Sequence, residues 1–164
     1  MVTKNIDHNK EIFEVIKKER GSVANIHSTF SDFPKGVEAH YQFYQKIMLA
    51  NDLPLCRLDR EQLAWATSLA NECPYCIHHH REAYKNANLG EVNKDKHKVL
   101  SQLAITLTKE PWKALQIKAD FRTVGYSEAQ WQHAVMVVSY FNLANRCAFA
   151  MDLDLEEDFE KTCL

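Results

Sequence analysis

Two cysteines and a histidine in the middle of the chain have the types and the spacing for redox chemistry. Cys73 and Cys76 flank Pro74 and Tyr75, and His80 follows Cys76 by four residues. Pro74 suits the first turn of a helix and disfavours helical geometry in the residue before it. We therefore expect Cys73 at a helix N-cap. Cys76 and His80 should then share its helical face, because positions three and four apart are neighbours.

Such an arrangement can activate a thiol. The free N–H groups and the positive dipole end of a helix favour a thiolate over a thiol, so we expect the helix N-terminus to help lower the pKa of Cys76. An imidazole one turn further along can accept the thiol proton, and a carboxylate can orient that imidazole. Glu61, twelve residues before Cys73 in a preceding predicted helix, is the candidate carboxylate. The second cysteine can capture the oxidised first one as a disulfide, so the set predicts a dithiol peroxidase or a disulfide reductase.

The spacing Glu-x11-Cys-x2-Cys-x3-His resembles that of the AhpD-like alkylhydroperoxidases in the carboxymuconolactone decarboxylase superfamily. Glu61, Cys73, Cys76 and His80 fill its four positions, and the wider resemblance covers residues 21–157. It implies an all-α, AhpD-like helical bundle that reduces small organic hydroperoxides. It also implies that a thiol or dihydrolipoyl-type reductant protein supplies the electrons.

The resemblance implies a role for each site residue. Cys76 attacks the peroxide, and Cys73 resolves the oxidised product as a disulfide. His80 takes the thiol proton and later helps to protonate the leaving oxygen, while Glu61 holds His80. The reverse order of the two cysteines is the alternative. One position departs from the family's pattern, because archetypal members carry a histidine directly before the second cysteine, where this chain has Tyr75.

Other polar residues could lie near this motif. His78 is expected to face solvent, whereas His79, three residues after Cys76, is a candidate neighbour of the site. Asn142 and Arg146 are four residues apart in a later predicted helix. We interpret them first as a buried structural network and second as part of the site.

A CxxC pair beside histidines is also typical of half a zinc site, with Cys73, Cys76, His80 and Glu61 as ligands. Structural zinc usually brings a second Cys/His pair at short spacing. The other three cysteines stand alone in the sequence. We expect Cys147 to be an inert core thiol, Cys56 an isolated thiol and Cys163 an incidental one. We therefore expect no metal and no cofactor.

Two other functions are alternatives to the peroxidase. A non-catalytic metal-binding or structural protein could share the same fold, and a lactone decarboxylase carries out the activity that names the superfamily. The CxxC pair does not mark that decarboxylase branch and argues against it. A thioredoxin-like enzyme is excluded, because its CxxC follows a strand and the segment before Cys73 has helical periodicity.

The composition favours one all-helical domain, since the 164 residues include only 4 Gly and 4 Pro. We expect an N-terminal helix within residues 1–20, the helical domain over 21–157 and a solvated acidic tail over 158–164. The 20 Lys and Arg nearly balance the 22 Asp and Glu, so neither nucleic acid nor an anionic membrane is an expected partner. An odd count of five cysteines and an N-terminus without an apolar core favour a cytoplasmic protein with mostly reduced thiols.

Capping residues and apolar spacing predict the individual helices. Ser22 is expected to cap a short helix and Asp59 the helix that carries Glu61. Ser127 and Gln130 fit a capping box ahead of the longest helix, which should end near residue 151. The other predicted helical ranges are 8–19, 35–50, 92–108 and 111–120.

The longest predicted helix is apolar from Ala134 on. Together with Phe30, Tyr41 and Tyr44, which are candidates for exposed aromatic residues, it offers more apolar surface than one small bundle readily covers. We therefore expect a homo-oligomer, and the resemblance implies a trimer or a hexamer.

Overall fold

The computed structural model describes residues 2–88 and 90–163, with side chains from residue 9 onward. This part of the chain contains helices and loops and no strand, which confirms the predicted all-α class. The α-helices are α1 (Val2–Arg20), α2 (Asn25–Ser28), α3 (Pro34–Tyr44), α4 (Arg57–Ala70), α5 (Pro74–Ala87), α6 (Lys94–Lys109), α7 (Lys118–Thr123) and α8 (Glu128–Ala150). A π-helical turn over Gln45–Leu49 continues α3, and short 3-10 helices cover Pro111–Ile117 and Phe159–Thr162.

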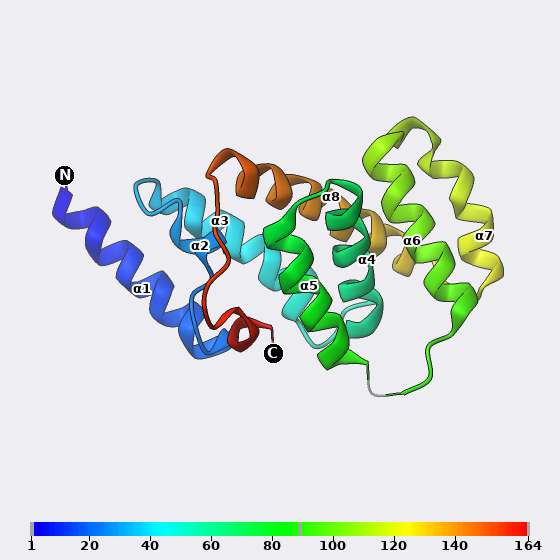
Figure 1. Cartoon of the computed structure of the whole chain (residues 1–164), viewed down its shortest axis with the longest axis horizontal. Coiled ribbons are helices and arrows are strands. Elements are labelled where there is room, and N and C mark those ends of the chain that lie inside the picture. The colour runs from blue at the N-terminus through cyan, green and yellow to red at the C-terminus, as the bar shows by residue number, and fades with distance from the viewer. Residues whose placement is uncertain (1, 89, 164) are drawn as a thin grey trace.

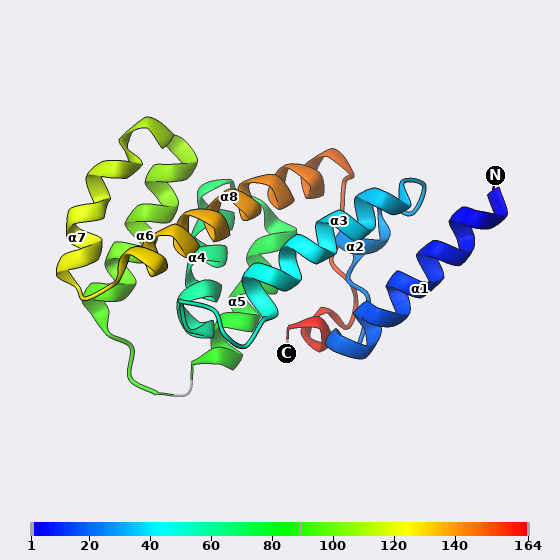
Figure 2. The same ribbon diagram turned by 180° about the vertical axis from the view of Figure 1, so that it is seen from behind.

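Helix α4 is the centre of the arrangement, because it packs against α5, α6 and α8. Figure 1 and Figure 2 show α1, α2 and α3 at one end of the molecule and α6 and α7 at the other. After α8 the chain runs back between α5 and the end formed by the first three helices (Figure 1). Segments from both ends of the sequence therefore lie beside α5, which carries the cysteines.

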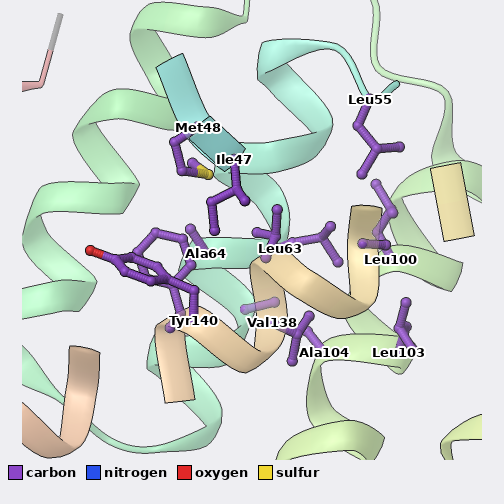
Figure 3. Packing of buried hydrophobic residues seen from close by; sticks show 14 of the residues in the cluster. Ile47, Met48, Leu55, Leu63, Ala64, Leu100, Leu103, Ala104, Val138 and Tyr140 are labelled. Carbon is purple, nitrogen blue, oxygen red and sulfur yellow. The ribbon is translucent and has the colours of Figure 1, made fainter. Parts of the chain in front are cut away.

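The main hydrophobic core lies where α4, α6 and α8 meet. Leu63 of α4, Leu103 of α6 and Val138 of α8 have no exposed surface. Figure 3 shows these side chains packed together with others from the π-helical turn and the loop that follows it, including Ile47, Met48 and Leu55. Close packing of this kind holds α4 and α8 in one relative position. In the site described below, α8 lines the cavity and α4 carries Glu61.

The helix caps agree with the sequence in two places and differ in two. Ser127 and Gln130 form the predicted capping box of α8, and Cys73 is the N-cap of α5. Ser22 is not a cap, since α2 begins later, with Ala24 before it. Asp59 lies inside the first turn of α4, whose N-cap is Cys56. Neither Ala24 nor Cys56 makes a side-chain capping hydrogen bond.

The prediction of a solvated tail over residues 158–164 is only partly right for the residues that the structure describes, because Asp158, Glu160 and Lys161 are exposed but the end of the segment is not. Thr162 and Cys163 are buried, so Cys163 is not an incidental surface thiol. The backbone oxygen of Cys163 accepts hydrogen bonds from Arg57 at 3.2 Å and from Asn86 at 3.3 Å. We call residues 151–163 the C-terminal segment. Its apolar side chains, spaced among the acidic ones, provide the surface that packs against the bundle.

The expected exposure is wrong for two of the three aromatic residues, Tyr41 and Tyr44, while Phe30 is half-buried. Tyr41 and Tyr44 are 1% and 7% exposed and belong to the core. The large apolar side chains that do face solvent near α3 and along α8 are Phe33, Met136, Leu143 and Phe149. No helix in residues 2–88 or 90–163 has the length and apolar character needed to cross a bilayer.

Candidate functional site

The turn between α4 and α5 fixes the position of the first cysteine. Glu72 has a left-handed backbone conformation with φ of 57°. Its N–H donates to the carbonyl of Leu69 at 3.0 Å, and the N–H of Cys73 donates to the carbonyl of Ser68 at 3.1 Å. These are the two hydrogen bonds of a Schellman motif that ends α4. Cys73 therefore completes the end of α4 and is also the N-cap of α5.

The two cysteines are buried together. Cys73 is 1% exposed and Cys76 is 4% exposed, and both are free thiols. They form a small apolar cluster with Tyr75 and with Ala148 of α8. The cluster is covered by Ile26 of α2 and by two leucines of the C-terminal segment, Leu153 and Leu155.

The pKa values of the two thiols differ in direction. A hydrogen bond from the Cys76 thiol favours the Cys73 thiolate, burial opposes it, and the backbone N–H of Cys76 favours it further, so the pKa of Cys73 is lowered to about 7. The same hydrogen bond to Cys73 raises the pKa of Cys76, and burial raises it further. We expected the helix N-terminus to lower the pKa of Cys76. The N-cap position gives that benefit to Cys73, whose sulfur lies where the helix N–H groups are free.

The expected pairing of His80 with Glu61 is present. Nδ1 of His80 and Oε2 of Glu61 are 2.9 Å apart, and the two side chains are only 13% and 4% exposed. The ring of Phe141 packs edge-on against the imidazole with centroids 4.3 Å apart. Because Nδ1 is engaged by the carboxylate, Nε2 is the ring nitrogen that can take up or deliver a proton.

Cys76 and His80 line the same small cavity, with a volume of about 60 Å³. A water molecule needs about 10–15 Å³ of such volume, so the cavity can admit a peroxide group but not a long alkyl chain without opening. Cys73 is not among the described residues that line it. Other lining residues are Arg20, His27, Tyr44, His79, Tyr140, Phe141 and Cys163.

A second histidine–carboxylate pair, which the sequence did not predict, lies beside the first. Nε2 of His79 is 2.9 Å from Oε2 of Glu156 in the C-terminal segment. The hydroxyl of Tyr75 donates to the other oxygen of Glu156 at 2.9 Å, and the N–H of Asn25 donates to that oxygen as well. Glu156 thus joins α5, α2 and the C-terminal segment. The sequence signal for this packing is weak and consists of Leu153 and Leu155, which lie among the acidic residues of the segment.

Tyr75 does not take over the proton-relay role of the histidine found at its position in archetypal AhpD proteins. Its hydroxyl is directed to Glu156 and accepts a hydrogen bond from the N–H of Ile26 at 3.2 Å. Burial raises the pKa of Tyr75, and the charge of Glu156 raises it further. The phenol therefore stays protonated and acts as a structural donor.

The remaining candidates have mixed outcomes. His78 is exposed, as expected, and His79 lines the cavity. Arg146 donates to Asn142 at 3.1 Å, so the expected network is present, but Arg146 is exposed and Asn142 only half-buried, so the network is not buried. Cys147 is partly exposed, and burial raises the pKa of its thiol. Among residues 9–88 and 90–163, no group of three His, Cys, Asp or Glu side chains is placed to hold a metal ion.

Two histidines that the sequence analysis did not assign to the site lie on one side of the cavity, where His27 lines it and His40 contacts His27 from outside the lining. Nδ1 of His27 is 3.3 Å from Nδ1 of His40, whose Nε2 is 3.1 Å from the hydroxyl of Tyr140. Burial lowers the pKa of both imidazoles, to about 4 for His40. Both are therefore neutral near pH 7 and serve as hydrogen-bonding groups on this side of the cavity.

An all-α chain with a CxxC pair at a helix N-terminus and a buried His–Glu pair one turn away defines a class of candidate thiol proteins. No protein-family model and no curated protein matches the sequence. Solved structures do match. The AhpD core of an uncharacterized peroxidase-related protein from Ralstonia eutropha JMP134 superposes with a TM-score of 0.81 at 20% identity, covering 96% of this chain and 90% of that one.

Two further structures extend this result. An uncharacterized peroxidase-related protein from Silicibacter sp. TM1040 gives a TM-score of 0.80 at 20% identity, with 96% and 90% of the two chains covered. A debrominase in its apo form gives 0.62 at 17% identity, with 94% and 89% covered. The chain therefore has the AhpD-like fold, as the sequence motif predicted. Because proteins described by different reactions share this fold, the reaction must be argued from the site.

The ionisation of Glu156 should make stability depend on pH. Burial opposes its charged form, but hydrogen bonds from His79 and the N–H of Asn25 outweigh burial and lower its pKa to about 2. A lowered pKa stabilises the fold above the unfolded-state value, and this contribution is lost as the pH falls towards 2. We expect Glu156→Gln to cost roughly 1–2 kcal/mol at pH 7 and much less near pH 2.5, measured by denaturant unfolding.

The neighbouring Glu157 is exposed and provides the matched control. Glu157→Gln should leave the unfolding free energy nearly unchanged at both pH values. An equal loss at pH 7 and pH 2.5 for Glu156→Gln would show that the charge of Glu156 does not contribute.

Proposed function

We propose that the chain is a thiol-dependent hydroperoxidase of the AhpD-like family, with Cys76, Cys73, His80 and Glu61 as its catalytic residues. The observation that carries the proposal is that Cys76 and His80 line one small cavity while Glu61 holds Nδ1 of His80 at 2.9 Å. A nucleophile, a base and a group that orients the base are the components of activated-thiol chemistry.

The proposed reaction begins at the sulfur of Cys76. Its proton passes to His80, and the sulfur attacks the terminal peroxide oxygen, which breaks the O–O bond and leaves a sulfenic acid. The departing alkoxide takes the proton back from His80 and becomes the alcohol. Cys73 then attacks the sulfenic sulfur and displaces hydroxide, which is protonated to water, so that a Cys73–Cys76 disulfide forms. Two electrons from a reductant restore both thiols.

The assignment of roles rests on access for Cys76 and on acidity for Cys73. Cys76 lines the cavity, so a peroxide can approach its sulfur. With a pKa of about 7, Cys73 is about half ionised near neutral pH. A resolving cysteine needs a thiolate but no access to substrate. Once Cys76 is a sulfenic acid its thiol no longer donates to Cys73, but its backbone N–H still favours the Cys73 thiolate. If Cys76 attacks first, it must lose its thiol proton. His80, oriented by Glu61, is the proposed acceptor of that proton.

The proposal includes a reducing partner, because each turnover ends with a disulfide. A thiol or dihydrolipoyl-type protein in the cytoplasm fits this need, since cytoplasmic conditions keep such dithiols reduced. A non-catalytic metal-binding role has no ligand cluster to support it in the described side chains. A decarboxylase role would leave the CxxC pair without a use.

Separate cysteine variants test the peroxidase. Cys76→Ser should abolish peroxide consumption, whereas Cys73→Ser should react once and leave a trappable sulfenic acid on Cys76. The exposed Cys56 is the control, and Cys56→Ser should behave like the parent. Free thiols are counted before and after one equivalent of peroxide, together with a metal analysis, and the parent should lose two thiols without bound metal.

Two results would change the proposal. If Cys76→Ser keeps a fast-reacting thiol and Cys73→Ser is inert, the roles of the two cysteines are reversed. If both variants consume peroxide like the parent, the chain is not a CxxC peroxidase.

The His80–Glu61 pair is tested through the rate of thiol oxidation. His80→Ala removes the general base, which typically contributes about 10²–10⁴-fold, so single-turnover oxidation of Cys76 should slow by that range. Glu61→Gln should slow it less, because the imidazole remains. The exposed His78 on the same helix is the control, and a His78→Ala rate as low as that of His80→Ala would contradict the relay.

We also propose that copies of this chain associate through the apolar face of α3 and α8. A groove of about 310 Å³ there is lined by Phe33, Phe43 and Leu143 among others, and Phe33 and Leu143 are 63% and 46% exposed. Leu143→Glu should shift the expected trimer or hexamer to a smaller species in sedimentation. Ile105→Glu, at an exposed position on α6, is the control. A monomeric parent at micromolar concentration would contradict this assembly.

A further inference from the structure

One buried amide connects α8 to both sides of the cysteine pair. Asn145 has no exposed surface. Its Oδ1 accepts a hydrogen bond from Asn71 at 2.8 Å, and its Nδ2 donates to the hydroxyl of Ser68 at 3.2 Å. Asn71 is the C-cap of α4, so these contacts are made to the last turn before Cys73.

The neighbours fix the orientation of this amide. The hydroxyl of Ser68 donates its hydrogen to the carbonyl of Ala64 at 2.8 Å, so its oxygen can only accept from Asn145. The NH₂ group must therefore face Ser68, which leaves its second N–H for another acceptor. The Asn145 side chain favours the thiolate form of Cys76, so we infer that the sulfur of Cys76 is that acceptor.

The same amide also supports the position of Cys73. Ser68, which Asn145 contacts through the hydroxyl, accepts the N–H of Cys73 through its carbonyl at 3.1 Å. Asn71 and the left-handed Glu72 complete that turn. A side chain of α8 thus contacts the turn that ends in Cys73, and its second N–H is free to approach Cys76.

We propose that Asn145 is a positioning residue for the cysteine pair, which holds the α4–α5 turn in place and supplies an N–H to the sulfur of Cys76. The hydrogen bonds then run in one direction, from Asn145 N–H to the sulfur of Cys76 and from the Cys76 S–H to the sulfur of Cys73. Successive hydrogen bonds of this kind strengthen one another. Asn145 therefore favours the singly ionised state of the pair, although it touches no substrate. Its importance for turnover rests on the proposed function, but its effect on the thiols does not.

The test is the ionisation of the pair rather than peroxide turnover. In Asn145→Ala the pair should ionise at higher pH, and alkylation of the CxxC peptide by iodoacetamide at pH 7, followed by mass spectrometry, should slow roughly tenfold. The equilibrium of the Cys73–Cys76 disulfide with dithiothreitol should shift towards the disulfide, because the reduced pair loses stabilisation.

Two variants separate this role from packing. Asn142 lies on α8 like Asn145, and its Oδ1 also accepts a hydrogen bond from Asn71, at 3.1 Å. Asn142→Ala therefore removes this second acceptor of Asn71 without involving Cys76. Ser68→Ala removes one partner of the amide but leaves the N–H to the sulfur. Both should leave the pH midpoint of alkylation near that of the parent. If all three variants lower stability alike and none moves the midpoint or the disulfide equilibrium, Asn145 is structural only and the proposal is wrong.

A measurement on the unaltered protein covers the case in which Asn145→Ala does not fold. The side-chain N–H signals of Asn145 in NMR should shift through the titration of the cysteine pair and on oxidation to the disulfide, whereas those of Asn142 should not. Asn145 signals that stay constant through both changes would overturn the proposal. A parent that fails to reduce peroxide but shows these shifts would refute the peroxidase and leave the role of Asn145 intact.

Discussion

The turn between α4 and α5 is the constraint on which the rest of the site depends. Cys73 belongs to both helices, because its N–H closes the end of α4 and its side chain lies at the start of α5. Any change in the angle between these helices would therefore move the sulfur relative to Glu61 on α4 and His80 on α5. The Asn145 contacts from α8 explain how a turn with an unfavourable left-handed Glu72 is held in this geometry.

The site also divides similar residues between different tasks. His79 and His80 are consecutive and both line the cavity, yet each has its own carboxylate. Glu61 comes from α4 and orients the imidazole proposed to move protons, whereas Glu156 comes from the C-terminal segment and fastens that segment to α5. The segment contributes Cys163 to the cavity wall, so the fastening by Glu156 keeps the cavity closed on that side.

The two thiols show that acidity and access need not lie on the same sulfur. Cys73 has the lowered pKa because it accepts from both the thiol and the N–H of Cys76, while Cys76 lines the cavity. In the proposed cycle each property is used in a different step, with access needed for the peroxide and acidity for closing the disulfide. This division makes the proton acceptor for Cys76 more important than it would be for an already ionised nucleophile.

The sequence by itself determined the all-α class, the N-cap position of Cys73, the capping box of α8 and the pairing of Glu61 with His80. These follow from local rules, such as proline at the first helical position and residues spaced by one helical turn, or from a motif with fixed offsets. Tertiary structure alone decided which thiol is the more acidic, that Glu156 and Cys163 reach the site, and that Asn145 contacts the turn between α4 and α5. Each of these depends on contacts between residues about 70 or more positions apart, or on the balance of burial against hydrogen bonding. Neither the long-range contacts nor this balance can be read from the spacing of neighbouring residues.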